Sequence, residues 1–469
     1  MYRRSNPGQL SPCTTFYITA LISAALIFSL QNGIRVPNIV YHENDERPDF
    51  NRPWRPDDAF ARLMTSGLSP VDLKLISRIP LEFGVTDDMI PGGDTTTIES
   101  ELSGKRLFLL DLDDIKSLAG SYEIGDATRY FAVPFALFHV SKYGKRLMPV
   151  AIQIDRNAGS LVFTPKDDPN DWLAARMFLN NCHFQVHQFR SHALACHFMQ
   201  EPMSVGTSRN LPSSHPIFKL LRPHFNGLIS INNTSRGSLV NSEDYKSLAR
   251  IAGDLFSMGA HGNTNSAIVF YKNMTFESFF FYNRLRANGV LDEGVIEDYP
   301  YRDDGRLVMT AIENYVRGIV RLYYPDDESV TNDEYIQAWA QDLVQNGMVR
   351  SRTLDGMSSI ASLSYFCSNI IFTASAFHAA VNFNQVAIAG NTANIPGSLY
   401  RPPPAEKGRL RERDLVDFLQ PNGKAQVQIG LMGLLSSNSG DRLGYFRERL
   451  FVDQEALKIQ EAVSHPLFD

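Results

Sequence analysis

Three equally spaced histidines lie within one apolar stretch of the chain. His187, His192 and His197 stand in the segment HQFRSHALACH, each five residues from the next. On a regular α-helix, positions five residues apart point about 140° away from each other, so two such imidazoles cannot easily share one ion. A π-helical turn brings them back to one face, and such turns are frequent at functional sites. The spacing therefore predicts a metal site on an irregular helix.

A second pair of candidate ligands lies far downstream, in the segment IFTASAFHAAVNFNQ. His378 and Asn382 are four residues apart there, which places both side chains on one helical face. Polar groups are costly to bury unpaired in apolar helices, and a metal ion held between two facing helices removes that cost. Imidazoles with an oxygen donor suit iron, and the sequence has no CxxC pair of the kind that binds structural zinc. We expect His187, His215 and His224 to hydrogen-bond near the site without binding the ion.

Composition limits the classes of protein to consider. With 469 residues, 43% of them hydrophobic, the chain is long enough for a large core. The net charge of −6 and the lack of a long basic block argue against nucleic acid as a partner. The four cysteines are too few and too scattered for a disulfide framework, and Cys182 and Cys196 are expected to be small buried thiols.

The N-terminus has features of a targeting segment. Basic residues precede the apolar run FYITALISAALIFSL, so we interpret residues 1–34 as a signal peptide or signal anchor, with a buried core helix as the alternative. Residues 35–58 have the composition of a linker. This interpretation predicts the secretory pathway, with a secreted or membrane-anchored product; otherwise the protein is cytoplasmic. Sequons at Asn232, Asn233 and Asn273 are compatible with that route.

The remaining sequence predicts a small sheet followed by a helical body. The segments RLFLLDLDD, RYFAVPFALFHVS, MPVAIQID and SLVFTP are typical of strands and lie before residue 166. Residues 58–80 (DAFARLMTSGLSPVDLKLISRIP) predict a helix, a turn and a second helix. From residue 166 onward the apolar periodicity is mostly helical, and acidic residues stand at the start of the long histidine-containing segment.

Several segments together resemble the catalytic domain of an animal-type lipoxygenase. They are WLAARMFLNNCHFQVHQFRSHALACH, LPSSHPIFKLLRPHF, YRDDGRLV and IFTASAFHAAVNFNQ. The family pattern His-x4-His-x4-His-x17-His-x8-His is complete here, from His187 to His224. The similarity runs from about Phe60 almost to the end, so we assign residues 59–469 to a C-terminally truncated catalytic domain. The resemblance implies a mainly α fold, with a helical bundle around a long central helix that carries a π-bulge, and a small β-subdomain near the N-terminal part.

The resemblance also implies roles for individual residues. His192, His197 and His378 match the family's iron ligands, and Asn382 matches a ligand position that is Asn or His. Two amides, Gln188 and Gln385, match groups that orient the ligands. Phe184 matches a residue that sets substrate depth, and Ser235 stands at an Ala-or-Gly position linked to product stereochemistry.

The resemblance implies one non-haem iron per chain and insertion of O2 into polyunsaturated fatty acids of the arachidonate or linoleate type, giving lipid hydroperoxides. Two features of the family are not expected in this chain. They are an N-terminal β-sandwich domain and a terminal isoleucine whose carboxylate binds iron, since the chain ends at Asp469. Two alternatives therefore stay open: a catalytically impaired lipid-binding or scaffold protein, and a truncated gene model of an active enzyme.

Overall fold

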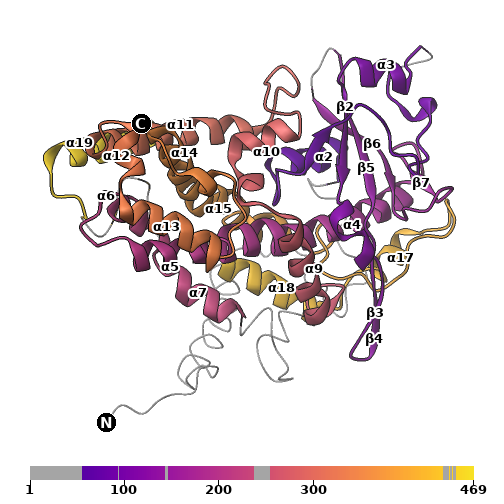
Figure 1. Cartoon of the computed structure of the whole chain (residues 1–469). Coiled ribbons are helices and arrows are strands. Elements are labelled where there is room, and N and C mark those ends of the chain that lie inside the picture. Colours follow the sequence, from indigo (N-terminus) through magenta and orange to yellow (C-terminus); the bar gives the residue numbers. More distant parts are fainter. Residues whose placement is uncertain are drawn as a thin grey trace, which may run out of the picture.

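The molecule has a small β-rich end and a larger helical body (Figure 1). The computed structural model describes residues 55–92, 95–142, 146–236, 254–436 and 450–468, together with Leu443 and Phe446. The predicted targeting segment 1–34 and most of the predicted linker lie outside the described residues. Within them, the predicted fold class, mainly α with a small β-subdomain, is confirmed.

The β-rich end contains a five-stranded antiparallel sheet and a separate hairpin. The sheet has the order β1 (Leu73–Leu75), β2 (Leu107–Asp111), β5 (Phe135–Val140), β6 (Leu147–Gln153) and β7 (Val162–Phe163), and the hairpin pairs β3 (Gly120–Ile124) with β4 (Ala127–Phe131). Side chains alternate between the two faces of a strand. Phe108 and Leu110 accordingly face the main core, while Leu107 and Leu109 face a smaller apolar cluster. Both faces are covered, which explains why the strand sequences are continuously apolar.

One predicted helix is wrong. Residues 58–80 begin with α2 (Asp57–Ser66), as expected, but the second half contains strand β1 instead of a helix. Leu73 pairs with Leu110 of β2 in antiparallel register. The neighbouring strand supplies backbone partners that the local helical periodicity cannot anticipate.

A long central helix crosses the body in three consecutive segments. They are α4 (Pro169–Val186), the π-helix η3 (His187–Phe198) and α5 (Gln200–Asn210). The side chain of Asp168 caps the first segment by accepting from the Asn170 amide at 2.9 Å, and Pro169 follows in the first helical position. Nearly all of α4 is buried around its whole circumference, as expected for a helix that forms a core.

A second interior helix faces the central one. It runs through α14 (Ile360–Phe372), the π-helix η8 (Thr373–Phe377), α15 (His378–Asn382) and α16 (Gln385–Ala389). Among the described residues, the stretch Ile360–Ala389 is the one helix long and apolar enough to span a membrane, but 61% of its most apolar window is buried in the protein. Its apolar character is therefore that of a core helix.

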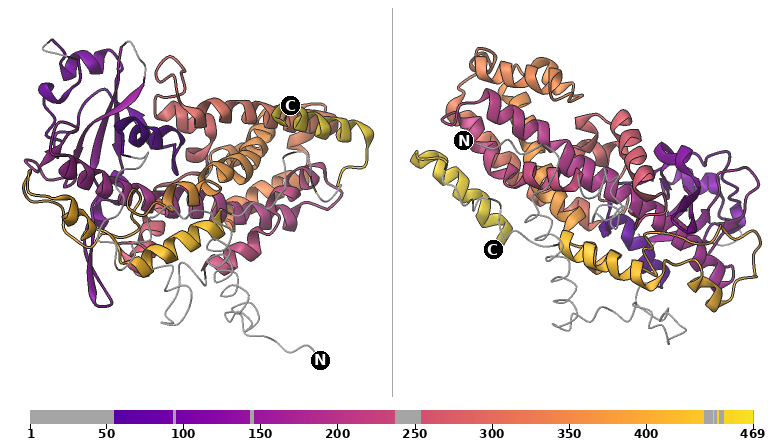
Figure 2. Two further views of the ribbon diagram at one scale, coloured as in Figure 1. Left: turned by 180° about the vertical axis from the view of Figure 1, so that it is seen from behind. Right: turned by 90° about the horizontal axis from the view of Figure 1, so that it is seen from below.

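Of the other helices, α3 (Ile98–Ser103) lies at the β-rich end (Figure 1), and the rest surround or flank the two interior helices. They are α6 (Pro216–Leu221), α7 (Leu228–Ser235), α9 (Gly259–Asn273), α10 (Phe281–Ala287), α11 (Pro300–Tyr323), α12 (Asp327–Thr331), α13 (Glu334–Gln345), α17 (Glu412–Val416), α18 (Asn422–Leu435) and α19 (Gln454–Phe468). Helix α19 lies along α11 (Figure 2). A Cβ at Gly318 would lie only 2.8 Å from the Ile459 side chain, so glycine permits this close approach.

Candidate metal centre

The three equally spaced histidines all lie on the π-helical segment η3, which spans His187–Phe198. The Met199 amide donates to the carbonyl of Leu194, five residues earlier, at 2.8 Å. Residues five apart are thus about one turn apart here, and His192 and His197 come to the same side of the helix. The irregular helix that the sequence predicts is confirmed by this geometry.

The ring nitrogens of three histidines from two helices meet at one point in the core. The Nε2 atom of His197 lies 3.2 Å from Nε2 of His192 and 3.1 Å from Nε2 of His378. The three candidate ligand atoms all lie within 4.8 Å of one another. Two nitrogens bound at about 2.1 Å to one ion, at a right angle, lie about 3.0 Å apart. The spacing of the imidazoles therefore fits a shared transition-metal ion.

All three imidazoles are held in their neutral form. Burial lowers the pKa of His197 to about 4, partly offset by its hydrogen bond to the side-chain oxygen of Asn232. Burial and the neighbouring His197 lower the pKa of His378 to about 3. Burial also lowers the pKa of His192 well below its usual range, and the adjacent histidines lower it further. Neutral imidazoles keep the lone pair that a metal ligand needs.

A chain of buried amides leads to Asn382, one helical turn beyond His378. The amide group of Gln188 donates to Oε1 of Gln385 at 2.5 Å, and the amide group of Gln385 donates to Oδ1 of Asn382 at 2.7 Å. Gln385 is fully buried, so these bonds are not exchanged with water. The structure thus brings together the three polar residues that the sequence placed around the site, and the relay fixes the orientation of the Asn382 amide.

Comparison with known proteins identifies the family. The family model "Lipoxygenase" matches residues 35–444 of this chain. The chain belongs to the lipoxygenase family. It is 32% identical over 410 residues to the polyunsaturated fatty acid lipoxygenase ALOX8 of Mus musculus, and the match covers 85% of this chain and 59% of that protein. It is also 32% identical over 410 residues to the hydroperoxide isomerase ALOXE3 of Homo sapiens, covering 86% of this chain and 56% of that protein.

A solved lipoxygenase structure has the same fold. The crystal structure of a lipoxygenase variant in complex with arachidonate superposes with a TM-score of 0.84 at 28% identity, and the match covers 97% of this chain and 69% of that one. The chain therefore spans somewhat more than half the length of the curated lipoxygenases it matches and about two thirds of the solved one.

Within this lipoxygenase fold, one neighbour of the candidate metal centre could not be recognised from the sequence. Oδ1 of Asn232 on α7 lies 3.2 Å from Nδ1 of His197. In the sequence Asn232 attracts attention only as part of a sequon. Its side chain is fully buried, whereas glycan attachment requires an exposed asparagine. No spacing rule links it to His197, because the two residues are 35 positions apart and on different helices.

The other histidines of the lipoxygenase pattern have separate partners. Nε2 of His187 donates to the carbonyl of Val381 at 2.6 Å, and its ring stacks against that of His192. His215 caps α6, with Nδ1 accepting from a backbone amide, and its Nε2 lies 3.1 Å from Asp333. His224 packs edge-on against Phe446. The structure therefore places none of these three in the cluster of ring nitrogens.

Two residues for which the resemblance implies a role in shaping the reaction lie on α4 and α7. Phe184 is buried, and its ring packs against those of His187 and Phe256 at centroid distances of 6.0 and 5.3 Å. Ser235 is the last residue of α7, three positions after Asn232. Their roles in setting substrate depth and stereochemistry remain predictions.

A buried carboxylate lies on the opposite side of the π-helix. Asp72, from the β-rich end, forms an ion pair with Arg190 of η3, and its Oδ1 also accepts from Arg284 at 2.8 Å. Its Oδ2 lies 3.2 Å from Nε2 of His183. Burial raises the pKa of Asp72, but the two guanidinium groups and the hydrogen bond from His183 lower it by more, so the carboxylate stays ionised. This cluster fixes the π-helix to the β-rich end.

Proposed function

We propose that this chain is the catalytic part of a non-haem iron dioxygenase that adds O2 to polyunsaturated fatty acids and yields lipid hydroperoxides. One observation carries the proposal: three neutral imidazole nitrogens from two core helices converge within 4.8 Å. The family supports it, and so does the polyunsaturated fatty acid named for the mouse relative.

Individual residues would have separate roles in this function. His192, His197 and His378 would hold the ion, and Asn382 would complete the set with an oxygen donor oriented by Gln385. Bound iron would supply the one-electron chemistry that removal of a hydrogen atom and addition of O2 require. In the net reaction one C–H bond of the fatty acid is replaced by a C–O–O–H group, and both oxygen atoms remain in the product.

The apolar surroundings suit such a substrate. Phe184 and Phe256 form part of an aromatic layer beside the histidines, and we propose that Phe184 limits how deeply the fatty acid enters. Ser235, at the end of α7, is proposed to face the carbon that receives O2. Export or membrane anchoring of the protein remains a proposal that depends on residues 1–34.

Metal content and product formation test the proposal together. The purified protein, loaded with ferrous iron, is expected to retain about one iron per chain and to convert linoleate or arachidonate to conjugated dienes, detected by ultraviolet absorbance. His197→Ala is expected to lose both iron and product. His261→Ala is the matched control, because His261 is an exposed histidine on α9.

The outcomes separate the alternatives. Wild-type protein with neither iron nor diene would refute the dioxygenase and favour a lipid-binding or scaffold role. Consumption of added lipid hydroperoxide without any diene formation would point instead to an isomerase, the activity named for the human relative. Iron content unchanged by His197→Ala would refute the ligand assignment.

A further inference from the structure

The buried amide of Asn232 makes three hydrogen bonds that fix its orientation. Its Nδ2 donates to the backbone carbonyl of His197 at 3.1 Å and to Oε2 of Glu201 at 2.8 Å. Because both amide hydrogens are used by acceptors, the oxygen of the amide must face Nδ1 of His197, 3.2 Å away. An oxygen there can only accept, so Nδ1 carries the proton and the lone pair of His197 is on Nε2.

Glu201 is fixed in turn by a cation at the protein surface. Both carboxylate oxygens of Glu201 accept from Arg236 at 2.5 Å. The guanidinium group of Arg236 lies over the ring of Phe198, 5.5 Å from its centroid, and its side chain is 43% exposed. The contacts therefore form a continuous path from solvent, through Arg236, Glu201 and Asn232, to His197.

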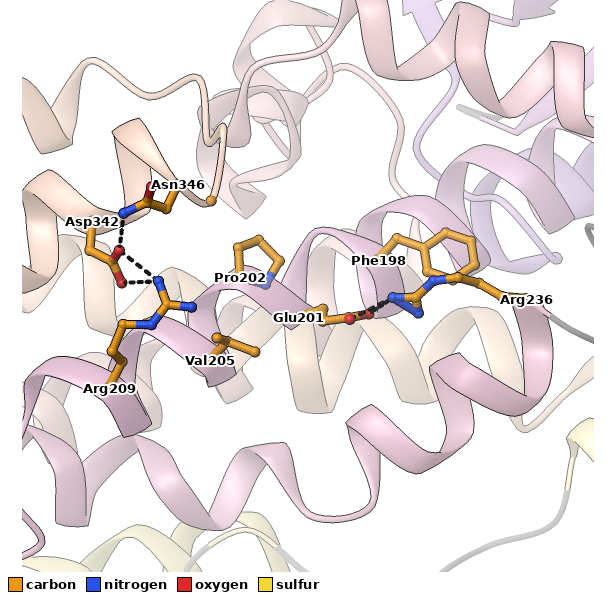
Figure 3. A pocket seen from close by; sticks show the side chains of 10 residues that line it. Phe198, Glu201, Pro202, Val205, Arg209, Arg236, Asp342 and Asn346 are labelled. Carbon is orange, nitrogen blue, oxygen red and sulfur yellow. Dashed lines mark hydrogen bonds and ion pairs between the residues drawn. The ribbon is translucent and has the colours of Figure 1, made fainter. Parts of the chain in front are cut away.

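The outer end of this path lines a groove of about 320 Å³ between α5 and α13. Figure 3 shows Glu201 pointing toward Arg236 at one end and Arg209 joined to Asp342 at the other. Arg209 is thus a second arginine of the same groove, with a separate carboxylate partner. The groove provides an internal comparison, since one of its ion pairs leads to the metal centre and the other does not.

We propose that Asn232 is a positioning residue for the metal ligand His197, and that the Glu201–Arg236 ion pair in the groove sets how firmly Asn232 is held. The proposal rests on the metal site of the proposed function. It adds that the strength of metal binding is controlled from the groove, by residues that do not touch the ion. Partners of a ligating histidine commonly change metal affinity by about 10- to 100-fold when they are removed.

The first test compares Asn232→Ala with Asn233→Ala, its exposed neighbour on α7. Iron release to a competing chelator and the rise in melting temperature on iron binding are measured for each protein. Asn232→Ala is expected to bind iron about 10- to 100-fold more weakly and to lose most of the iron-dependent rise, while Asn233→Ala behaves as wild type. A variant that melts lower by the same amount with and without iron would show a merely structural role and overturn the proposal.

The second test perturbs the groove and leaves Asn232 in place. Arg236→Gln is expected to weaken iron binding in the same direction but less, and Arg209→Gln to leave it unchanged. Equal effects of the two substitutions would contradict the path through Glu201. Because both positions are partly exposed, these variants remain informative if Asn232→Ala does not fold.

A third variant pair tests the polarity of the hydrogen bonds. Asn232→Asp alone places two carboxylates in contact, since residue 232 lies 2.8 Å from Glu201. Adding Glu201→Gln restores a donor opposite an acceptor, so the double variant is expected to bind iron more tightly than Asn232→Asp alone. If the double variant binds iron no more tightly than Asn232→Asp, the hydrogen-bonded path from Arg236 to His197 is contradicted. If the wild-type protein binds no iron, the proposed function is refuted. If the wild-type protein binds iron and Asn232→Ala binds it equally well, only this inference is refuted.

Discussion

Asp72→Asn is expected to destabilise the protein more than a typical single substitution. Asparagine has nearly the same shape as aspartate, so the substitution removes the charge and leaves the packing intact. The Asp72 side chain is 2% exposed and faces Arg190, which is 7% exposed, and Arg284, which is 21% exposed. Without the carboxylate, the buried Arg190 keeps only the exposed Asp114, 3.8 Å away, as an acidic partner.

The expected loss follows from these exposures. Removing one partner of a buried ion pair costs about 3–5 kcal/mol. Arg284 reaches water in part, so we expect the lower end of that range, about 3 kcal/mol. Asp114→Asn is the matched control, because Asp114 lies 3.8 Å from the same arginine but is 52% exposed. A surface pair of that kind contributes about 0–1 kcal/mol.

Urea unfolding, followed by circular dichroism and tryptophan fluorescence, gives the free energy of unfolding of both variants. Urea is uncharged, so it does not screen the ion pair as an ionic denaturant would. A loss below about 1 kcal/mol for Asp72→Asn would refute the argument, since that is the value of an exposed pair. Adding Arg190→Met removes the buried cation that has lost its main partner and is expected to restore part of the stability.

The pH dependence of Asp72→Asn provides an independent check. In the folded protein the pKa of Asp72 lies below its ordinary value of 3.8, because Arg190, His183 and Arg284 together outweigh the effect of burial. The carboxylate therefore stabilises the fold at pH values above 3.8, and this contribution is lost as the pH falls below that value. The stability difference between wild type and variant should be constant from pH 5 to 7 and shrink in acid.

Two further predictions concern the core. Gln385→Leu removes the amide that donates to Oδ1 of Asn382 and should weaken iron binding by about 10- to 100-fold; iron release to a chelator at the wild-type rate would contradict this. Burial raises the pKa of the Cys182, Cys196 and Cys367 thiols, so none of the three should react with a thiol reagent in the folded protein at pH 8. Peptide mapping before and after unfolding checks this, and labelling of any of them in the native state would contradict it.

The sequence predicts the features that depend on residues close together in the chain. The five-residue spacing from His187 to His197 indicates a π-helix, because a π-helical turn brings residues five apart back to one face. The structure has a π-helix over these residues. The four-residue spacing of His378 and Asn382 similarly fits one turn of α15. The apolar runs before residue 166 become β2, β5 and β6 because strand pairing satisfies their backbone groups.

Features that depend on contacts between distant segments could not be predicted. Asp72 lies in a loop before a short strand, and its pairing with Arg190 joins residues 118 positions apart. Asn232 occurs in a polar sequence typical of a surface helix, yet the fold places it beneath His197. The second π-helix, η8, also escaped prediction, because no pair of polar residues in Thr373–Phe377 marks its period.

The two groups that the sequence did not reveal act on opposite sides of the same irregular helix. On one side Ser191 hydrogen-bonds to Ser69 at 2.8 Å, beside the Asp72–Arg190 pair; on the other, Asn232 donates to the carbonyl of His197 at 3.1 Å. A long π-helix is rare, and most helical stability in proteins comes from tertiary packing. These contacts from both sides therefore maintain the geometry in which His192 and His197 would share an ion. Because a metal ion would bind only that geometry, folding of η3 and affinity for the metal are coupled, and a change on either side of the helix should alter both.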